Sequence, residues 1–240
     1  MLWPCIKMRP SEWQRVPARV HCRVVKVEGI RHLVDAGFTT TDVWRRVEED
    51  VREAISGMVW PPGNDRFVIN PVKDGNGVIP IKKQFAAKIE ARGWRLEEKF
   101  PKLSDEEARK RRPGDVDAAF DLGDREEDRF FVEWETGNIS SSHRAMNKMA
   151  LALKLGLITG GMWVVPSGSL AYYLTDRIGN YPEFEPYFGL YSDLDIEHGY
   201  LGVAIVEHDE ISRDVPFIPK QKKKAMPGSV EDEPDSEQLF

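Results

Sequence analysis

Three stretches of the chain repeat their apolar residues at the three- to four-residue spacing of an amphipathic helix. They are residues 39–58, 81–93 and 140–156. A threonine at position 40 or 41 can cap the first, and Gly93 and Gly156 are typical helix ends. The core-facing positions that the spacing predicts are Val43, Val47, Val51, Ile55, Phe85, Ile89, Met146, Met149, Ala150 and Leu153.

Between these helices lie short apolar runs that are typical of β-strands. They are residues 21–27, 30–36, 94–100, 115–122, 130–137, 157–167 and 200–211. A polar connection joins 115–122 to 130–137, so these two should form an antiparallel hairpin. The next strand follows a helix and should pair parallel with its predecessor. Residues 171–188 predict a helix and then an aromatic loop. The pattern as a whole predicts an α/β fold with a central mixed β-sheet flanked by helices.

The chain is expected to form a single domain over residues 1–214. Residues 1–80 would be its N-terminal strand and helix part, and residues 81–214 a core that contains the candidate catalytic acids discussed below. From residue 215 to residue 240 proline, lysine, serine and acidic residues dominate. Such a composition buries too little apolar surface to fold, so we expect a disordered charged tail.

Composition excludes several protein classes and leaves the partner open. No run of 18 apolar residues occurs, which argues against a membrane span, and the first residues lack a secretion pattern, so we expect a cytoplasmic protein. With Cys5 and Cys22 as its two cysteines, the chain offers no disulfide framework or zinc cluster. The net charge of −6 does not indicate a nucleic-acid binder, although local patches decide contacts. Basic residues gather at 82–83, 109–112 and 220–224.

Two acids lie inside the second strand of the predicted hairpin. Glu133 and Glu135 are two residues apart and therefore project from the same face, and Val132 and Trp134 flank the first of them. Burying ionised carboxylates costs several kcal/mol unless a proton or a cation compensates their charge. This position therefore requires a compensating group.

The partner strand brings further acids toward the same place. Asp115, Asp117 and Asp121 share one face of it, and a register that places Phe120 near Phe131 sets Asp117 close to Trp134 and its acidic neighbours. Converging carboxylates repel one another, and either a shared proton or a bound cation resolves the repulsion. Oxygen donors of this kind suit Mg²⁺, Mn²⁺ or Ca²⁺ better than zinc. Such a site is suited to hydrolysing a phosphodiester with a metal-activated water.

Two other interpretations of the acids are open. Acids on a hairpin are often a solvated edge, although Trp134 between the two glutamates commits part of the strand to the core. A glycosidase also uses two carboxylates. The chain is short for that function and lacks strand-end acids at regular intervals.

The order of the acids resembles the PD-(D/E)xK nuclease superfamily, in which an aspartate on one strand precedes an acidic motif on its hairpin partner. The fuller text resembles its type II restriction endonucleases, in the branch that contains BamHI and BglII. The segments that carry the resemblance are FAAKIEARGW, GDVDAAFDL and FFVEWETGNISSSHR. The resemblance implies a restriction-endonuclease-like core and sequence-specific cleavage of double-stranded DNA.

The resemblance also implies roles for individual acids. Asp117 matches the metal-binding aspartate and Glu133 the acid that follows it. Glu135 stands at a third position that is usually lysine, which leaves open how the attacking water is held. The superfamily often adds a glutamate from the preceding helix, and Glu90 is the candidate here, against the alternative that it is a solvated helix residue. Its rivals are Glu97 and Glu98. The implied cofactor is Mg²⁺, for which Mn²⁺ can substitute.

Residues beyond Glu135 are candidates for DNA contacts. In enzymes of the resembled type, residues just past the last acid reach base edges, which suggests this role for Asn138 and Ser140. Arg144 and Lys148 are candidates for bases or phosphates, since arginine reads guanine bidentately as asparagine reads adenine. The alternative is that the serines only cap the helix and that Arg144 is a surface residue.

Recognition of palindromic DNA implies a two-fold symmetric homodimer. The helix at 140–156 can supply part of its interface or be a plain core helix. His143 is a candidate general base, against the alternative of a capping hydrogen bond. Two rival functions remain: a repair or structure-selective nuclease of the same fold, and a DNA-binding module without activity.

Overall fold

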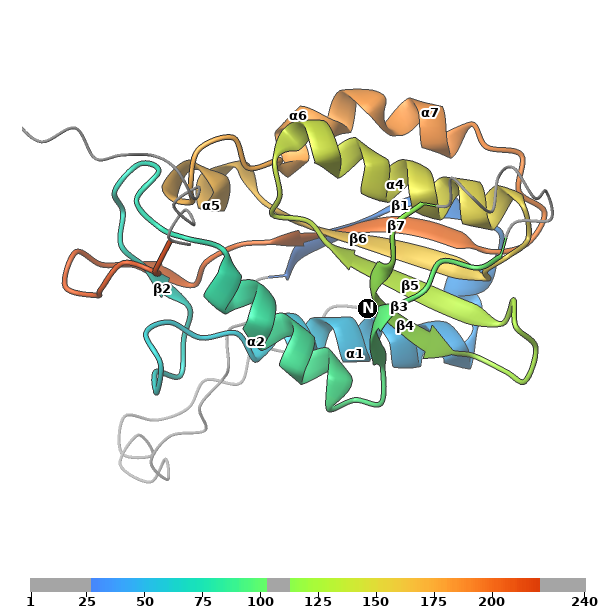
Figure 1. Ribbon diagram of the computed structural model, residues 1–240, viewed down its shortest axis with the longest axis horizontal. Coiled ribbons are helices and arrows are strands. Elements are labelled where there is room, and N and C mark those ends of the chain that lie inside the picture. The colour runs from blue at the N-terminus through green and yellow to red at the C-terminus, as the bar shows by residue number, and fades with distance from the viewer. Residues whose placement is uncertain (1–26, 103–112, 221–240) are drawn as a thin grey trace, which may run out of the picture.

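The computed structural model describes residues 27–102 and 113–220. It shows three layers, with a sheet between two layers of helices (Figure 1). Several expectations lie outside the described residues: most of the predicted strand at 21–27, the two cysteines, the basic run at 109–112 and the tail beyond residue 220.

The central sheet has six strands in the order β1-β7-β6-β5-β4-β3. Strands β5, β6 and β7 run parallel, whereas β1, β4 and β3 each run antiparallel to the neighbour nearer the sheet centre. This confirms the predicted mixed sheet, the hairpin and the parallel crossover. The strands are β1 Val27–Asp35, β3 Arg95–Glu98, β4 Val116–Asp121, β5 Arg129–Trp134, β6 Gly160–Pro166 and β7 Tyr200–Val206. A separate parallel pair comprises β2 Val68–Ile69 and β8 Glu210–Ile211.

Helices α1 and α2 cover one face of the sheet, and α4, α6 and α7 lie over the other (Figure 1). The predicted aromatic loop is in fact a series of short helices, because Pro182 and Pro186 occupy the first turns, where a missing N–H is tolerated. The helical elements are η2 Phe38–Thr40, α1 Asp42–Ser56, α2 Ile79–Glu90, α4 Ile139–Lys154, α5 Gly168–Tyr173, α6 Tyr181–Phe184, η3 Glu185–Tyr187 and α7 Phe188–Ser192.

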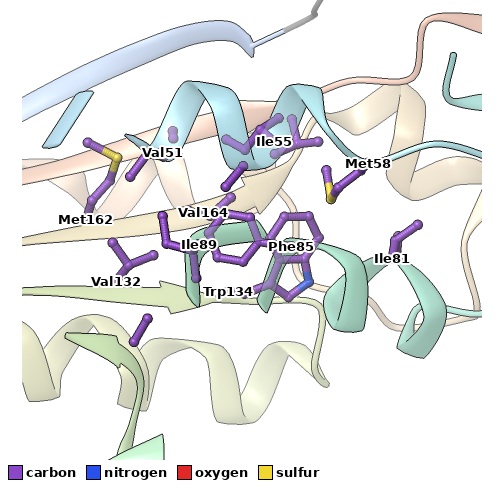
Figure 2. Close-up of a cluster of buried hydrophobic side chains, with 14 of the residues drawn as sticks. Val51, Ile55, Met58, Ile81, Phe85, Ile89, Val132, Trp134, Met162 and Val164 are labelled. Carbon is purple, nitrogen blue, oxygen red and sulfur yellow. The ribbon is translucent and has the colours of Figure 1, made fainter. Parts of the chain in front are cut away.

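Helix α1 begins where the sequence predicts. The hydroxyl of Thr41 accepts a hydrogen bond from the backbone N–H of Trp44 at 3.1 Å, which is the N-cap geometry. Three predicted positions of its apolar face are buried, while Val43 is only partly buried, and Trp44 beside it packs inward instead. Figure 2 shows Val51 and Ile55 packed with Phe85 and Ile89 of α2 against strands β5 and β6.

Strand β5 is covered on both faces, so neither of its faces is a solvated edge. Val132 and Trp134 belong to the core under α1 and α2, whereas Phe131 belongs to the core under α4. Glu133 alternates with them and is directed to the α4 side, where it is 7% exposed. A carboxylate at this depth requires a partner from α4.

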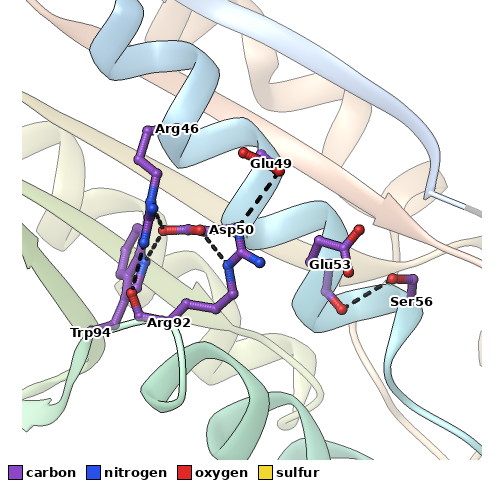
Figure 3. Close-up of polar contacts among 7 residues, drawn as sticks. All are labelled: Arg46, Glu49, Asp50, Glu53, Ser56, Arg92 and Trp94. Atoms are coloured by element: carbon purple, nitrogen blue, oxygen red, sulfur yellow. Dashed lines mark hydrogen bonds and ion pairs between the residues drawn. The ribbon is translucent and has the colours of Figure 1, made fainter.

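A buried carboxylate fixes α1 against the turn between α2 and β3 (Figure 3). Asp50 is fully buried and accepts hydrogen bonds from Arg46 at 2.9 Å, Arg92 at 2.5 Å and Trp94 at 3.0 Å. Charge-assisted bonds to a carboxylate are among the strong ones. This network fixes both the end of α2 and the start of β3, and these two elements border the acidic site.

Two boundaries differ from the sequence predictions. The predicted hairpin register was wrong by one residue, since Phe120 pairs with Phe130 and not with Phe131. Phe130 and Phe131 are adjacent and both fully buried, so the sequence leaves the register ambiguous. The segment 215–220, expected to begin the charged tail, packs onto the domain. Ile218 is fully buried, and its backbone N–H donates to Asn76 at 3.1 Å.

Candidate active site

An acidic pocket of about 350 Å³ lies where β5 ends and β4 begins, bordered by the start of α2 and the first turns of α4. Four acids and three bases contribute to its wall, so opposite charges are interleaved rather than segregated. The charged lining residues are Asp115, Asp117, Glu133, Glu135, Lys82, Arg144 and Lys148. The structure therefore brings the three acids of the predicted motif together.

Asp117 uses both carboxylate oxygens. Its Oδ1 accepts from the ammonium of Lys82 at 2.8 Å, and its Oδ2 accepts from the backbone N–H of Trp134 at 2.9 Å. The second bond crosses the hairpin and fixes the carboxylate beside the acids of β5. The sequence prediction that Asp117 lies close to Trp134 is thus met through the side chain, despite the shifted register.

Glu133 is paired with a buried lysine. The ammonium of Lys148 forms an ion pair with its Oε1 and also donates to the backbone carbonyl of Asp115 at 2.6 Å. Burial raises the pKa of the Glu133 carboxyl to about 7, although the attraction of Lys148 opposes the rise. In this structure a lysine from α4 therefore supplies the compensating charge that this strand position requires.

Glu135 lies just past the end of β5 and is half-buried. Its Oε1 accepts from the backbone N–H of Gly137 at 2.6 Å, which closes the chain into a tight turn. Burial raises the pKa of Glu135, and this hydrogen bond acts in the opposite direction. The carboxylate is thereby held in the wall of the pocket, shortly before α4 begins.

The raised pKa of Glu133 predicts how stability varies with pH when divalent cations are absent. Between pH 4.5, the ordinary pKa of a glutamate, and about pH 7, Glu133 holds a proton in the folded protein that it has released in the unfolded chain. The free energy of unfolding is therefore expected to fall by about 3 kcal/mol as pH rises through this window. Urea denaturation in EDTA at pH 5 and pH 8 measures the difference.

The control for this pH dependence is Glu133→Gln, which cannot titrate and should lose most of the fall. The pKa of Glu207 is lowered to about 2, so its contribution changes below pH 4.5 and does not overlap. An equal fall in the parent and in Glu133→Gln would contradict the assignment of the effect to Glu133.

The donor set suits a hard divalent cation, although the acids are not yet arranged as ligands. Among residues 27–102 and 113–220, no three histidine, cysteine or acidic side chains are close enough to hold a metal ion. Lysine ammonium groups occupy Asp117 Oδ1 and Glu133 Oε1 instead. Carboxylate oxygens beside an open pocket are the chemistry that Mg²⁺ requires, so the residues fit such an ion once a lysine yields its place.

The structure does not bring Glu90 to this pocket. It is exposed at the far end of α2, whereas Lys82 near the start of the same helix faces the acids. Glu97 of β3 lies closer, since it lines a small adjoining cavity together with Asp117 and Lys82. Its backbone has a φ of 51°, a left-handed conformation that a glutamate rarely adopts in a strand.

The predicted DNA contacts divide into exposed and buried residues. Asn138 and Arg144 are exposed, and Arg144 borders the acidic pocket. Ser140 lies in the first turn of α4. Lys148 is only 8% exposed, so the structure gives it Glu133 and not a base edge as its partner. His143 packs edge-on against the rings of Phe184 and Tyr187, outside the acidic pocket.

Sequence reasoning missed Lys82 as a partner of Asp117, and it missed a neighbour of Asn138. The backbone around Asn138 forms an antiparallel bridge to Ile178, which places Arg177 beside the acidic turn. Arg177 is exposed and has a φ of 64°. In the sequence Arg177 precedes Ile-Gly-Asn, and this pattern does not predict a position beside the acidic turn.

None of the helices in the described residues is long and apolar enough to cross a membrane.

Comparison with known proteins identifies close relatives of the chain. The family model of restriction endonuclease BamHI matches residues 23–223. The type II restriction enzyme OkrAI from Oceanobacter kriegii is 43% identical over 171 residues, which are 71% of this chain and 84% of OkrAI. The type II restriction enzyme BamHI from Bacillus amyloliquefaciens is 38% identical over 175 residues, which are 71% of this chain and 78% of BamHI.

The fold is also similar to a solved structure of BglII in complex with a DNA 16-mer. The TM-score is 0.51 at 10% identity, and the match covers 75% of this chain and 78% of BglII. At this identity the likeness supports the restriction-endonuclease-like core and nothing finer. The family model spans the residues of the acidic pocket, and each of the two curated relatives matches 71% of this chain. The chain belongs to the BamHI family of type II restriction endonucleases.

Proposed function

We propose that the acidic pocket is where this endonuclease hydrolyses palindromic double-stranded DNA with Mg²⁺ as cofactor. The observation that carries the proposal is the convergence of Asp117, Glu133 and Glu135 on one pocket at the end of β5. Each strand of the duplex would be cut in one active site, which leaves a 5′-phosphate and a 3′-hydroxyl. A restriction enzyme meets incoming DNA in the cytoplasm, which is its proposed location.

Each acid has a distinct role in this proposal. Asp117 and Glu133 would hold the cation, because their carboxylates point into the pocket from adjacent strands. The bound cation would lower the pKa of a water molecule and stabilise the charge that builds on the phosphate oxygens. Glu135, in the pocket wall, would orient the attacking water and accept its proton. Its raised pKa makes the carboxylate a better proton acceptor.

We further propose Glu97, in place of Glu90, as the additional carboxylate of the site. Glu97 and Asp117 line the same small cavity, and the backbone of Glu97 is left-handed. The variant Glu97→Gln is expected to lower the rate of DNA cleavage about 10- to 100-fold, because one anionic group beside the cation is lost. Glu90→Gln is the matched control and should cleave at the parent rate. Equal loss in both variants would contradict the assignment.

The surface around α4 would bind the DNA. A helix N-terminus attracts phosphate, and α4 begins immediately after the acidic turn. Asn138 and Ser140 at this start, with Arg144 one turn on, are the proposed contacts. Arg177 joins them through the bridge between Asn138 and Ile178. Lys148 is withdrawn from this set because of its burial.

Cleavage of both strands of a palindrome requires two copies of the chain related by a two-fold axis. Leu151 of α4 and Leu155, which follows the last residue of α4, are both exposed, and Leu190 of α7 is 70% exposed. A group of large exposed apolar side chains marks an interaction surface more often than a single exposed apolar side chain does. We propose that this α4–α7 face is the homodimer interface.

The proposed function is tested by incubating the protein with unmethylated phage DNA and Mg²⁺. Discrete fragments are expected, with ends that share one palindromic sequence; intact DNA or a smear would contradict the proposal. A branched DNA junction in a parallel reaction tests the rival repair nuclease, which would cut the junction and leave the phage DNA whole.

A further inference from the structure

The two lysines of the acidic pocket differ in how firmly they are held. Lys148 is 8% exposed and has two partners, the Glu133 carboxylate and the Asp115 carbonyl. The side chain of Lys82 is 42% exposed, and the one ion pair described for it is the pair with Asp117. A half-exposed ion pair on a flexible stem contributes little to stability and is readily exchanged. Lys82 is therefore the lysine that can move.

The pairing of Asp117 shows why Lys82 has to move. Oδ2 of Asp117 is occupied by the backbone N–H of Trp134, which the hairpin fixes in place. Oδ1 is the oxygen left for a cation, and the ammonium of Lys82 lies 2.8 Å from it. Two cations cannot share one carboxylate oxygen at this distance without strong repulsion. A divalent cation on Oδ1 would therefore expel the ammonium.

The pocket offers the expelled ammonium a second anion. Lys82 lies near the start of α2 and lines the open pocket of about 350 Å³. Its ammonium can therefore turn toward the interior of the pocket without movement of the helix. The DNA phosphate that is to be cut must enter the same pocket to reach the acids. An ammonium is a compact charge on a four-carbon stem that suits a single phosphate oxygen.

We propose that Lys82 is an exchangeable counter-ion, paired with Asp117 while no divalent cation is bound and with the scissile phosphate once one is. This inference rests on the proposed function, because it requires a cation and DNA to meet in this pocket. It predicts two effects of opposite sign for one substitution. Without Lys82 the cation loses a competitor, and the DNA loses a phosphate contact.

The first measurement is calorimetric titration of the DNA-free protein with Mn²⁺ alone. Lys82→Met keeps the length of the stem and removes its charge, and it is expected to bind Mn²⁺ about three- to tenfold more tightly than the parent. Lys83→Met is the matched control. Lys83 is the exposed neighbour on α2 and lines neither cavity that contains Asp117. It should leave Mn²⁺ affinity unchanged.

The second measurement is the affinity for a duplex that contains the cleavage site, at several salt concentrations in Ca²⁺, with intact DNA verified afterwards. Loss of one phosphate contact should weaken binding by Lys82→Met about tenfold and reduce the slope of log affinity against log salt by about 0.9. Lys83→Met should keep the parent slope.

The outcomes separate this inference from the proposed function. If the parent protein binds no Mn²⁺ and cuts no DNA, the proposed function itself is contradicted. If the parent does both but Lys82→Met binds Mn²⁺ no more tightly than the parent, the inference alone is overturned. An unchanged salt slope in Lys82→Met overturns it as well, since the phosphate would then have another partner.

Discussion

Replacing Asp117 by asparagine is expected to slow DNA cleavage by about 10³-fold or more, which corresponds to about 4 kcal/mol of lost transition-state stabilisation. An amide is a far weaker ligand than a carboxylate for a hard cation, and Asp117 presents its Oδ1 to the pocket. The fold should survive, because the amide oxygen can still accept the hydrogen bond of the Trp134 N–H. Single-turnover cleavage of a plasmid with one site measures the loss.

The control is Asp121→Asn on the same strand. Asp121 pairs with Arg95 at the far end of the hairpin, in a polar hollow separate from the acidic pocket. Its loss should leave cleavage within about twofold of the parent rate, as surface ion pairs contribute little. If both variants cleaved at similar rates while remaining folded, the role of Asp117 as a cation ligand would be untenable.

Substitution of Lys148 by methionine is expected to lower the free energy of unfolding by about 3–5 kcal/mol at pH 8 without divalent cations. The change leaves Glu133 buried and ionised without its neighbouring cation, and it removes the donor that the Asp115 carbonyl uses. For a domain of this size, the melting temperature should fall by about 6–20 °C. Differential scanning calorimetry in EDTA provides the measurement.

A second substitution distinguishes this electrostatic cause from lost packing. In the double variant Lys148→Met with Glu133→Gln, the buried charge is gone, so most of the lost stability should return. At pH 5 the single variant should also recover, because the Glu133 carboxyl then takes up a proton. If the double variant were as unstable as Lys148→Met at both pH values, the lost stability would come from the packing of the aliphatic part of Lys148 and not from its charge.

The sequence predicted those elements whose apolar residues keep a regular period. Helix α1 was predicted with a threonine cap, which the structure places at Thr41, and the crossover helix was predicted from its apolar stripe. The hairpin was predicted from two apolar runs joined by a polar connection. The acids Asp117 and Glu133 came together as expected, since a hairpin places opposite residues side by side. The predicted hairpin register differed from the structure by one residue, because Phe130 and Phe131 both fit a core position.

Contacts that depend on how helices pack over the sheet were not predictable in the same way. Lys82 and Lys148 reach the acids from α2 and α4, and no local pattern reports where a long side chain ends. Glu90 was favoured over Glu97 because the resembled superfamily often adds a glutamate from the preceding helix. In the structure the start of α2 faces the pocket instead, and Glu97, whose own backbone is left-handed, lines a small cavity that Asp117 also lines.

The presence of a cation between the two acidic strands is tested most directly by anomalous diffraction from crystals soaked in Mn²⁺. A peak bonded to both Asp117 and Glu133, with the Lys82 ammonium displaced from Oδ1, is the predicted result. Well-ordered carboxylates at saturating Mn²⁺, still paired with their lysines and without anomalous signal between them, would contradict it.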